Sequence, residues 1–595
     1  MAQRVTGDFT ADRRLIPLVA LAIPIGALCA VLAAALLKLI ALFTNVFFFH
    51  RLSWAAASPA ANTLGPWAIL PPIAGGLLVG LIARFGSERI RGHGIPEALE
   101  AILIGRARME PKVAVLKPVS SAIAIGSGGP FGAEGPIVMT GGACGSIIAQ
   151  VFHLTSAERK TLLVAGAAGG MSATFGTPVA AVLLAVELLL FEWKPRSFIP
   201  VALASGVAAA LRPLLLGGGA LFPVAGAAAI GPAVLGACLV VGVAAGLMSG
   251  LLTWAVYAAE DLFHRLPFHW MWWPVLGGLF VGIGGLIEPR ALGVGYDVIG
   301  KVLHGDLAAG SVVRLLFVKG LIWSLALGSG TSGGVLAPLL LMGSSVGFLL
   351  GPILPAGGHA IWPLIGLAAI LAGTMRCPLT GIVFAVELSQ RVDALLPLLV
   401  ACAAAYALTV LLLPRSILTE KVARRGHHLS REYIVDPLET LLVEQIASTP
   451  AITVPAGLSI AELEARYFDP RTGRSHQGYP VVDAKGRLCG VVTRSELLGL
   501  PSRDELESIH VASVVTGKAV VAVADETCRA AADRMLQEGV GRLPVVRREA
   551  PREVIGIITR SDILKARERL FDTEQRRESL LQFPRPNIGQ PSGRR

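Results

Sequence analysis

The distribution of apolar and charged residues divides the chain near residue 420. Before this point, long apolar segments alternate with short Gly- and Pro-rich breaks, whereas charged residues become frequent from Glu420 onward. The first apolar run extends from Leu15 to Phe49, and Lys38 is its only charged residue. This run is too long for a signal peptide and long enough to span a bilayer. The pattern predicts a membrane domain over residues 15–425, after a short cytoplasmic N-terminus, residues 1–14.

Several later apolar segments are shorter than a membrane span and begin at a proline. They are residues 136–151, 178–191, 338–350 and 378–388, whereas residues 232–258 are long enough to cross the hydrocarbon. Irregular backbone at membrane depth is tolerated only where protein buries it or where it lines a wet cavity. We therefore expect these prolines to mark the ends of broken or re-entrant helices that line a cavity.

Two motifs of the membrane domain recur in the same order. They are Lys117 with Gly126–Gly128 and Lys319 with Gly328–Gly330, at an offset of 202, and Pro178–Glu187 with Pro378–Glu387, at an offset of 200. Two membrane repeats with broken helices are typical of transporters, whose substrate sites lie near the midplane where half-helix N-termini meet. The repeats are expected at about 15–217 and 228–418.

Four charged residues also recur within these repeats. Lys117 and Lys319 are interpreted as snorkelling or helix-capping residues, with a contribution to the anion potential of a cavity as the alternative. Glu187 and Glu387 are interpreted as structural.

The segment Gly126–Gly142 has the composition of an anion site. Its glycines allow the backbone to approach a ligand closely, and Pro136 suits the first turn of a helix. Free amides before that turn, together with the helix dipole, attract an anion. Glu134 stands at this place as a tethered anion, which can occupy the site and leave when it is protonated or displaced. This interpretation makes Glu134 a gate, and an ordinary helix cap is the alternative.

The second repeat contains a related segment, Gly333–Pro338, in which Leu336 stands where the first repeat has Glu134. This helix start offers only backbone amides, from Val335 and Leu336. A third loop that opens a helix is Gly92–Glu97. The sequence therefore predicts an anion between two amide cradles, of which only one carries a carboxylate.

Composition supports a membrane protein and excludes several other classes. Hydrophobic residues make up 53% of the chain and charged residues 16%, whereas a soluble globule has about a quarter. The net charge of +11 is assigned to cytoplasmic flanks rather than to nucleic-acid binding. The seven cysteines are scattered, which argues against a disulfide framework or a zinc site. We find no motif of an enzyme and no metal site.

The region after residue 430 has a mixed α/β pattern and a second internal repeat. Strands are expected at residues 477–482 and 488–492, and again at residues 543–546 and 554–558. Each pair ends in a similar phrase, which contains Thr493 and Glu496 in the first copy and Thr559 and Asp562 in the second. The expected organisation is a linker (426–436), two modules (437–505 and 506–572) and a disordered tail (573–595).

Three segments of the membrane domain resemble the signature segments of the CLC family of chloride channels and proton-coupled chloride exchangers. Gly92–Glu97 (GHGIPE), Gly132–Pro136 (GAEGP) and Gly334–Pro338 (GVLAP) are similar to GSGIPE, GxEGP and GxFxP, in the same order. The resemblance covers about residues 15–425. It implies an all-α polytopic membrane fold of two inverted repeats, a homodimer with one pore per subunit, and transport of chloride or a similar anion. It also implies that both termini are cytoplasmic, in a bacterial inner or plasma membrane.

The resemblance assigns roles to individual positions. Glu134 matches the gating glutamate, His93 falls where the family commonly has the inner-gate serine, and Leu336 falls where it commonly has phenylalanine. Leu418 falls where the family has an anion-coordinating tyrosine, so one hydroxyl donor is missing. The implied anion-binding residues are His93, Gly132, Ala133, Gly135, Val335, Leu336 and Leu418. We expect weak central anion binding, and we hypothesise that His93 makes flux sensitive to cytoplasmic pH.

The exchangers of the family commonly deliver protons through a glutamate that directly follows another glutamate. Here the pair reads Glu187-Leu188, so these two candidates for the proton path offer one carboxylate. This difference favours channel-like flux, and proton-coupled exchange is the alternative. A divalent-cation transporter with a similar C-terminal region is less favoured, because hard cations need carboxylates that the pore segments lack.

The C-terminal repeat resembles a tandem of CBS modules. In that family the Thr and Asp of the repeated phrase contact the phosphate and ribose of an adenine nucleotide. Thr559 and Asp562 match this pattern, and Thr493 with Glu496 matches it less well because the acidic side chain is longer. The pair is therefore expected to be a cytoplasmic regulatory module, with an adenine nucleotide as its candidate ligand. A packing and dimerisation module that binds nothing is the alternative, and transport itself is expected to require no cofactor.

Overall fold

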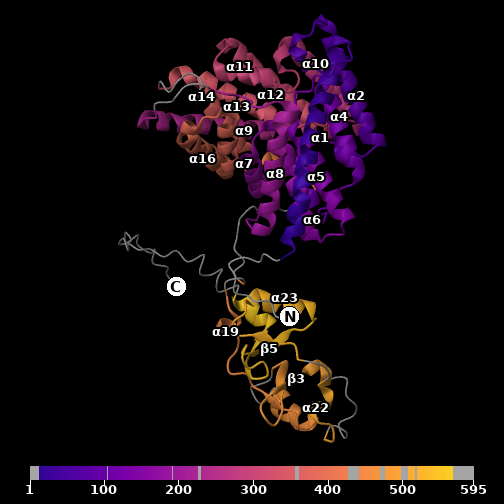
Figure 1. Cartoon of the computed structure of the whole chain (residues 1–595), viewed down its shortest axis with the longest axis vertical. Helices are drawn as coiled ribbons and strands as arrows, with labels where there is room; N and C mark the ends of the chain where they lie inside the picture. Colours follow the sequence, from indigo (N-terminus) through magenta and orange to yellow (C-terminus); the bar gives the residue numbers. More distant parts are fainter. Residues whose placement is uncertain are drawn as a thin grey trace, which may run out of the picture. The chain divides into compact units, whose positions relative to one another are not determined.

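The computed structural model describes residues 13–103, 105–190, 192–224, 230–355, 361–426, 438, 441–469, 476–497, 507–515 and 519–566. The chain forms two compact units, one within Phe9–Glu432 and the other within Tyr433–Arg595 (Figure 1). The first unit is helical and the second is α/β. The expected disordered tail, and the expected linker apart from Gly426, lie outside the described residues.

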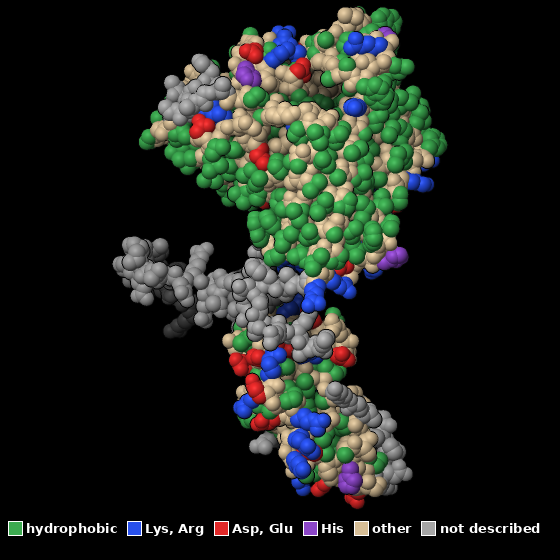
Figure 2. Space-filling view, in the orientation of Figure 1, with side chains coloured by type: hydrophobic (Ala, Val, Ile, Leu, Met, Phe, Trp, Pro, Cys, Tyr) green, Lys and Arg blue, Asp and Glu red, His purple; other side chains and the backbone are tan. Residues whose placement is uncertain are grey.

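The helical unit is called the membrane unit below, and it includes the residues 15–425 in which the sequence predicts membrane helices. By length and composition, eight apolar helical segments of the described residues could cross a membrane. Figure 2 shows a broad apolar band on this unit, with charged side chains gathered toward its two ends. The helices are α1 (Leu15–Phe49), α2 (Leu70–Phe85), α3 (Ile95–Leu103), α4 (Pro111–Gly126), α5 (Glu134–Val151), α6 (Ser156–Phe175), α7 (Pro178–Leu184), α8 (Pro195–Leu216), α9 (Pro232–His264), α10 (Trp273–Ile287), α11 (Tyr296–His304), α12 (Ala309–Gly328), α13 (Leu336–Leu350), α14 (Ile361–Met375), α15 (Pro378–Ser389), α16 (Leu395–Leu412) and α17 (Ile417–Arg424).

The short helices begin close to the predicted prolines. α7 and α15 begin at Pro178 and Pro378, where the missing proline N–H needs no partner. α5 and α13 each begin two residues before their proline, at Glu134 and Leu336. A π-helical segment, Ala185–Leu190, continues α7.

The two repeats contact each other reciprocally. Glu187 of the first repeat accepts hydrogen bonds from the backbone N–H groups of Leu379 (3.1 Å) and Thr380 (2.8 Å) at the start of α15. Glu387 of the second repeat accepts from Val179 (3.0 Å) and Ala180 (2.9 Å) at the start of α7. Each half thus caps the other, as expected of two halves related by a twofold axis, so the internal repeat seen in the sequence is a structural repeat.

The loops before α5 and α13 show how the halves are oriented. Gly132 and Gly334 form an antiparallel bridge, with N–H to O distances of 3.1 and 2.9 Å. Because the two loops run antiparallel at this point, the helices that follow start out in opposite directions. This arrangement agrees with the predicted fold class, an all-α polytopic protein of two inverted repeats.

Each module of the C-terminal unit has a three-stranded sheet. The strand order is β1-β2-β3 in the first sheet and β4-β5-β6 in the second, with one parallel and one antiparallel pairing in each. The four predicted strands are present within one residue at either end. The elements are α19 (Val443–Ile446), β1 (Val454–Pro455), α20 (Ile460–Leu463), β2 (Gly478–Val482), β3 (Leu488–Thr493), α21 (Arg494–Leu497), α22 (Val511–Val514), β4 (Ala522–Val523), α23 (Cys528–Gln537), β5 (Arg542–Val546) and β6 (Val554–Thr559).

The two modules exchange their leading segments. Val443, in the leading segment of the first module, lies in the apolar core of the second and donates its backbone N–H to the carbonyl oxygen of Glu526 (2.9 Å). Val511, at the start of the second module, lies in the core of the first. The modules predicted as 437–505 and 506–572 therefore complete each other, and we expect neither to fold well alone.

Glu387 provides a test of the reciprocal capping. Replacing Glu387 with Ala removes a carboxylate acceptor from two amides at the start of α7, and we expect a loss of about 1–2 kcal/mol in the free energy of unfolding. Thermal unfolding of the purified protein in detergent would measure the change. Asp306→Ala, at an exposed carboxylate of the same unit, is the matched control. Equal melting curves for the two variants would contradict the capping role.

Candidate functional site

Three loops meet at the centre of the membrane unit, and each leads into a helix. Gly92, before α3, donates its N–H to Gly330 and accepts from Gly333, both at 3.4 Å. Gly132 and Gly334 form the bridge described above. The starts of α3, α5 and α13 are therefore tied to one another by backbone hydrogen bonds.

Glu134 lies fully buried at this junction, with none of its surface exposed. The sequence places it at the start of its own helix, and it is the first residue of α5. Its carboxylate, however, binds the opposite repeat, because the backbone N–H of Ala337 in α13 donates to Oε1 at 2.5 Å. This amide lies next to the predicted donors, Val335 and Leu336. Glu134 thus places its carboxyl group at a helix N-terminus, but that helix belongs to the other half and is not the one that Glu134 begins.

Gly132 makes room for this carboxylate. A Cβ atom at Gly132 would overlap both carboxylate oxygens of Glu134. Gly135 is confined in a similar way, because its own Cβ would overlap the carbonyl oxygen of His93. The glycines of GAEGP therefore serve close packing around the carboxylate, and Ala133 between them is fully buried.

The other predicted anion-binding residues differ in what they present to the junction. His93 is buried, its carbonyl faces Gly135, and its Nδ1 has no hydrogen-bond partner among the described residues. Val335 and Leu336 are buried at the start of α13. Leu418 is fully buried in α17 and contributes an apolar side chain.

Two buried lysines hold the loops that lead into α3 and α11. Lys117 Nζ donates to the carbonyl oxygens of Ile90 (2.8 Å) and Gly92 (2.7 Å). Lys319 Nζ makes the equivalent bonds to Ala291 (2.9 Å) and Gly293 (2.7 Å). Both lysines therefore act as internal clamps on loop carbonyls.

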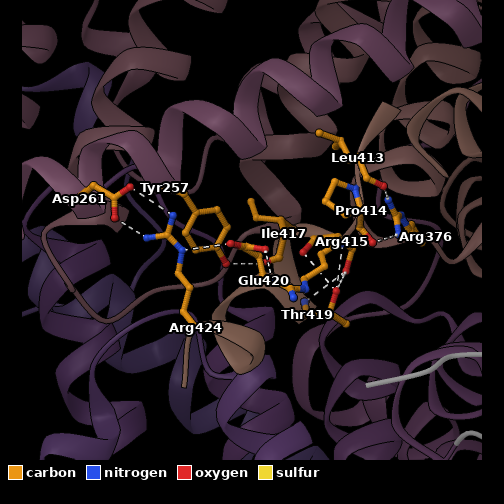
Figure 3. A network of polar contacts seen from close by, with 11 residues as sticks. Tyr257, Asp261, Arg376, Leu413, Pro414, Arg415, Ile417, Thr419, Glu420 and Arg424 are labelled. Atoms are coloured by element: carbon orange, nitrogen blue, oxygen red, sulfur yellow. Dashed lines mark hydrogen bonds and ion pairs between the residues drawn. The ribbon is translucent and has the colours of Figure 1, made fainter. Parts of the chain in front are cut away.

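The helix that carries Leu418 is anchored to α9 by a polar network (Figure 3). Tyr257 Oη donates to the carbonyl oxygen of Ile417 at 2.5 Å. Arg424 lies 4.7 Å from the centre of the Tyr257 ring, forms an ion pair with Asp261, and donates to Glu420 at 3.2 Å. These contacts fix α17 at both its start and its end.

A second set of ion pairs joins α17 to α3. Glu97 Oε1 lies 3.3 Å from Lys421 Nζ and 3.4 Å from an Arg425 nitrogen. The other oxygen of Glu97 accepts from the N–H of Gly94 at 2.9 Å. Glu97 therefore connects the His93 loop to the helix that carries Leu418.

A charged cavity of ≈660 Å³ opens beside these ion pairs. Residues of α3, α9, α12 and α17 line it, and Met139 of α5 contributes to its wall. Six basic side chains and five glutamates line it. The acidic groups are therefore balanced by basic ones, and the lining does not repel a small anion. These charged side chains are Arg89, Arg91, Arg108, Lys421, Arg424, Arg425, Glu88, Glu97, Glu100, Glu110 and Glu260.

The two candidates for the proton path lie in the π-helical continuation of α7. Glu187 is bound to the start of α15, where the hydroxyl of Thr380 also donates to it at 2.6 Å. Leu188 is fully buried and apolar. The position that follows the first glutamate therefore offers no group that can carry a proton.

Sequence analysis missed one polar residue near the junction, Tyr296. It is the first residue of α11, and its hydroxyl is buried. α3 and α11 are both nine residues long and start 201 positions apart, at Ile95 and Tyr296. Extending the internal repeat to this loop would have identified the position, but its counterpart in the first repeat is apolar.

The predicted nucleotide-binding residues form two equivalent local structures. Asp562 accepts from the N–H (2.9 Å) and the hydroxyl (2.7 Å) of Thr559 at the end of β6. Glu496 accepts from the same two groups of Thr493, at 2.6 and 3.0 Å. The longer glutamate thus reproduces the geometry of the aspartate. Across the described residues, no group of His, Cys, Asp and Glu is placed to hold a metal ion.

Comparison with known proteins agrees with this arrangement. The profile of a family described as voltage gated chloride channel matches residues 74–410, and the CBS domain profile matches residues 443–503 and 511–569. A ClcB-like chloride channel protein of Ralstonia nicotianae is 30% identical, over 58% of this chain and 83% of its own length. The H(+)/Cl(-) exchange transporter ClcA of Citrobacter koseri is 32% identical, over 54% of this chain and 71% of its own length.

Solved structures share the fold. A slow cyanobacterial Cl-/H+ antiporter matches with a TM-score of 0.62 and 22% identity, over 69% of this chain and 97% of its own. A eukaryotic CLC transporter matches with a TM-score of 0.57 and 19% identity, over 92% of this chain and 98% of its own. The family assignment replaces the divalent-cation transporter that the sequence left as a less favoured alternative. The chain belongs to the voltage-gated chloride channel family, and it carries a pair of CBS domains after its membrane unit.

Proposed function

We propose that this protein moves chloride or a similar small anion across a membrane in exchange for protons, with Glu134 as both gate and proton carrier. The observation that carries the proposal is the Glu134 carboxylate, bound to the α13 backbone at the place where the two repeats meet. The exchangers among its relatives support coupled transport over the channel-like flux that the sequence favoured.

The proposed exchange follows from the charge of the Glu134 carboxylate. A carboxylate at a helix N-terminus is held by a backbone N–H and by the helix dipole, and a chloride ion satisfies the same two requirements. A proton on Glu134 removes the charge that holds the carboxylate, so the side chain leaves and an anion takes its place. Loss of the proton reverses this step. The deprotonated Glu134 carboxylate and the anion thus compete for a single place, and a proton on Glu134 shifts this competition toward the anion.

Uncoupled, channel-like flux is the second candidate, and Leu188 favours it. A buried leucine cannot relay a proton, and the neighbouring Glu187 is bound to the start of α15. In that case Glu134 would gate the anion path without carrying protons through the protein.

We propose further that the protein is a homodimer with both termini in the cytoplasm, in a bacterial inner membrane. Arg13 and Arg14 precede α1, and Arg424 and Arg425 end α17. Basic residues that flank membrane helices favour the cytoplasmic side.

The two candidates differ in proton movement. In liposomes that contain the purified protein, exchange predicts that a chloride gradient drives protons against their own gradient. Glu134→Gln, which cannot take part in this cycle, is expected to abolish proton movement and leave chloride flux. Simultaneous recording with a chloride electrode and a pH electrode measures both.

Asp306→Asn, at an exposed carboxylate outside the cavity lining, is the control and should keep coupled flux. Chloride flux without proton movement in the unchanged protein would establish the channel instead. Absence of anion flux in folded protein would rule out both candidates.

Gly132 allows a second test of the gate. An added methyl group at this position displaces the Glu134 carboxylate, so Gly132→Ala should behave like an open gate, with chloride flux raised several-fold at high external pH. Gly236→Ala is the matched control, because a Cβ on this α9 glycine meets open space. A stopped-flow assay of chloride efflux from liposomes makes the comparison. Unchanged gating in a folded Gly132→Ala protein would contradict the assigned position of the carboxylate.

We propose that the CBS pair binds an adenine nucleotide and regulates transport. Asp562→Ala removes the acceptor of two hydrogen bonds that hold Thr559, so we expect affinity for ATP to fall about tenfold. Calorimetric titration of ATP into the full-length protein measures it, with Asp533→Ala on α23 as the control. If the unchanged protein binds no ATP, the module serves packing alone.

A further inference from the structure

Two buried oxygen atoms near the junction have no hydrogen-bond partner within the described part of the chain. One is Oε2 of Glu134 and the other is the phenolic oxygen of Tyr296. α11, which begins at Tyr296, packs against α13, whose first turn binds the Glu134 carboxylate, and the two side chains also interact electrostatically. A buried polar atom without a partner is costly, so two such atoms near each other point to a shared ligand or to a second arrangement of the side chains.

The fold brings Tyr296 to this place from the second repeat. α11 is the counterpart of α3, and Lys319 holds its leading loop as Lys117 holds the loop of His93. His93 and Tyr296 therefore approach the junction from opposite halves of the protein.

Aromatic neighbours fix the tyrosine ring. Its centroid lies 6.1 Å from that of Phe175 in an edge-on arrangement and 6.2 Å from that of Phe222. Phe175 in turn packs edge-on against Phe384 at 5.1 Å. The hydroxyl is thus held in place by an apolar cluster before any ligand binds, which lowers the entropy lost when it forms a hydrogen bond.

Charge determines which group donates in a hydrogen bond between the Tyr296 hydroxyl and an anion. A carboxylate can only accept, and so can a halide, whereas the phenol has a proton to donate. Leu418 supplies no hydroxyl, and the Tyr257 hydroxyl is bound to the backbone of α17. In the described part of the membrane unit, Tyr296 is the tyrosine whose buried hydroxyl has no hydrogen-bond partner, so it can donate to an anion.

We propose that the Tyr296 hydroxyl donates a hydrogen bond to the small monovalent anion that takes the place of the Glu134 carboxylate. The anion would then be held by an α13 amide on one side and by Tyr296 on the other. Tyr296 supplies from α11 the hydroxyl that α17 lacks. This inference rests on the proposed transport of an anion through the Glu134 place.

Direct binding tests this role apart from transport. Glu134→Ala vacates the carboxylate place, and chloride is titrated into this purified variant by calorimetry. Adding Tyr296→Phe, which keeps the ring and removes only the hydroxyl, is expected to weaken chloride binding about tenfold. Adding Tyr406→Phe instead, at an exposed tyrosine of α16 outside the junction, should leave the affinity unchanged. Equal affinity in the two double variants would overturn the proposal.

A spectroscopic measurement covers the case in which the Tyr296 variant is unstable. The chain has six tyrosines, so fluorotyrosine labelling gives few ¹⁹F signals, and the signal lost in Tyr296→Phe assigns position 296. In the Glu134→Ala protein this signal should shift during chloride titration, with the midpoint found by calorimetry. A signal that stays fixed while chloride binds would also overturn the proposal. If the unchanged protein moves no chloride but the Tyr296 signal responds, the proposed transport fails and the anion contact stands.

Discussion

The structure depends on one constraint, which is that backbone amides at broken helix ends must not face lipid. A helix N-terminus in the middle of a membrane protein has unbonded N–H groups, and hydrocarbon offers them no partner. Here the starts of α5 and α13 meet, so the carboxylate of one half satisfies an amide of the other. The same solution appears again where Glu187 and Glu387 cap α15 and α7 across the twofold axis. In the proposed transport cycle, an anion that replaces the Glu134 carboxylate would satisfy the same amide.

Burying this arrangement requires fixed charges nearby, and each has its own compensation. The ammonium groups of Lys117 and Lys319 are bound by pairs of loop carbonyls, which remain neutral acceptors and keep the positive charge inside. Glu97 is paired with Lys421 and Arg425 where α3 meets α17. A buried charge that is paired and hydrogen-bonded is tolerated, and removal of one partner leaves the other uncompensated. The loops around the anion place are therefore rigid by electrostatics as well as by packing.

The sequence predicted the local features of the membrane unit, namely its helix starts and its internal repeat. Proline and glycine mark helix starts wherever they occur, and the repeat appears as matching letters, so α5, α7, α13 and α15 could be located in advance. The partner of the Glu134 carboxylate could not, because a reciprocal contact between halves leaves no periodicity in either half. Tyr296 was missed since its counterpart is Ile95, and a repeat comparison looks for identity. The exchange of segments between the CBS modules could not be predicted either. Val443 and Val511 are both valines typical of a core, and only the packing of the folded chain shows which core each one enters.

The most informative departure from the exchangers concerns the path of the proton. A carboxylate at position 188 would sit in the π-helical continuation of α7, but with leucine there Glu187 is the one carboxylate of this segment. Glu187 cannot replace it without cost, because a proton on Glu187 would weaken the bonds to Leu379 and Thr380 that cap α15. The charged cavity, by contrast, reaches Met139 of α5, about one and a half turns from the helix start that carries Glu134. In the proposed exchange, a proton that approaches Glu134 from the side of α17 therefore has a polar route through this cavity, whereas position 188 offers none.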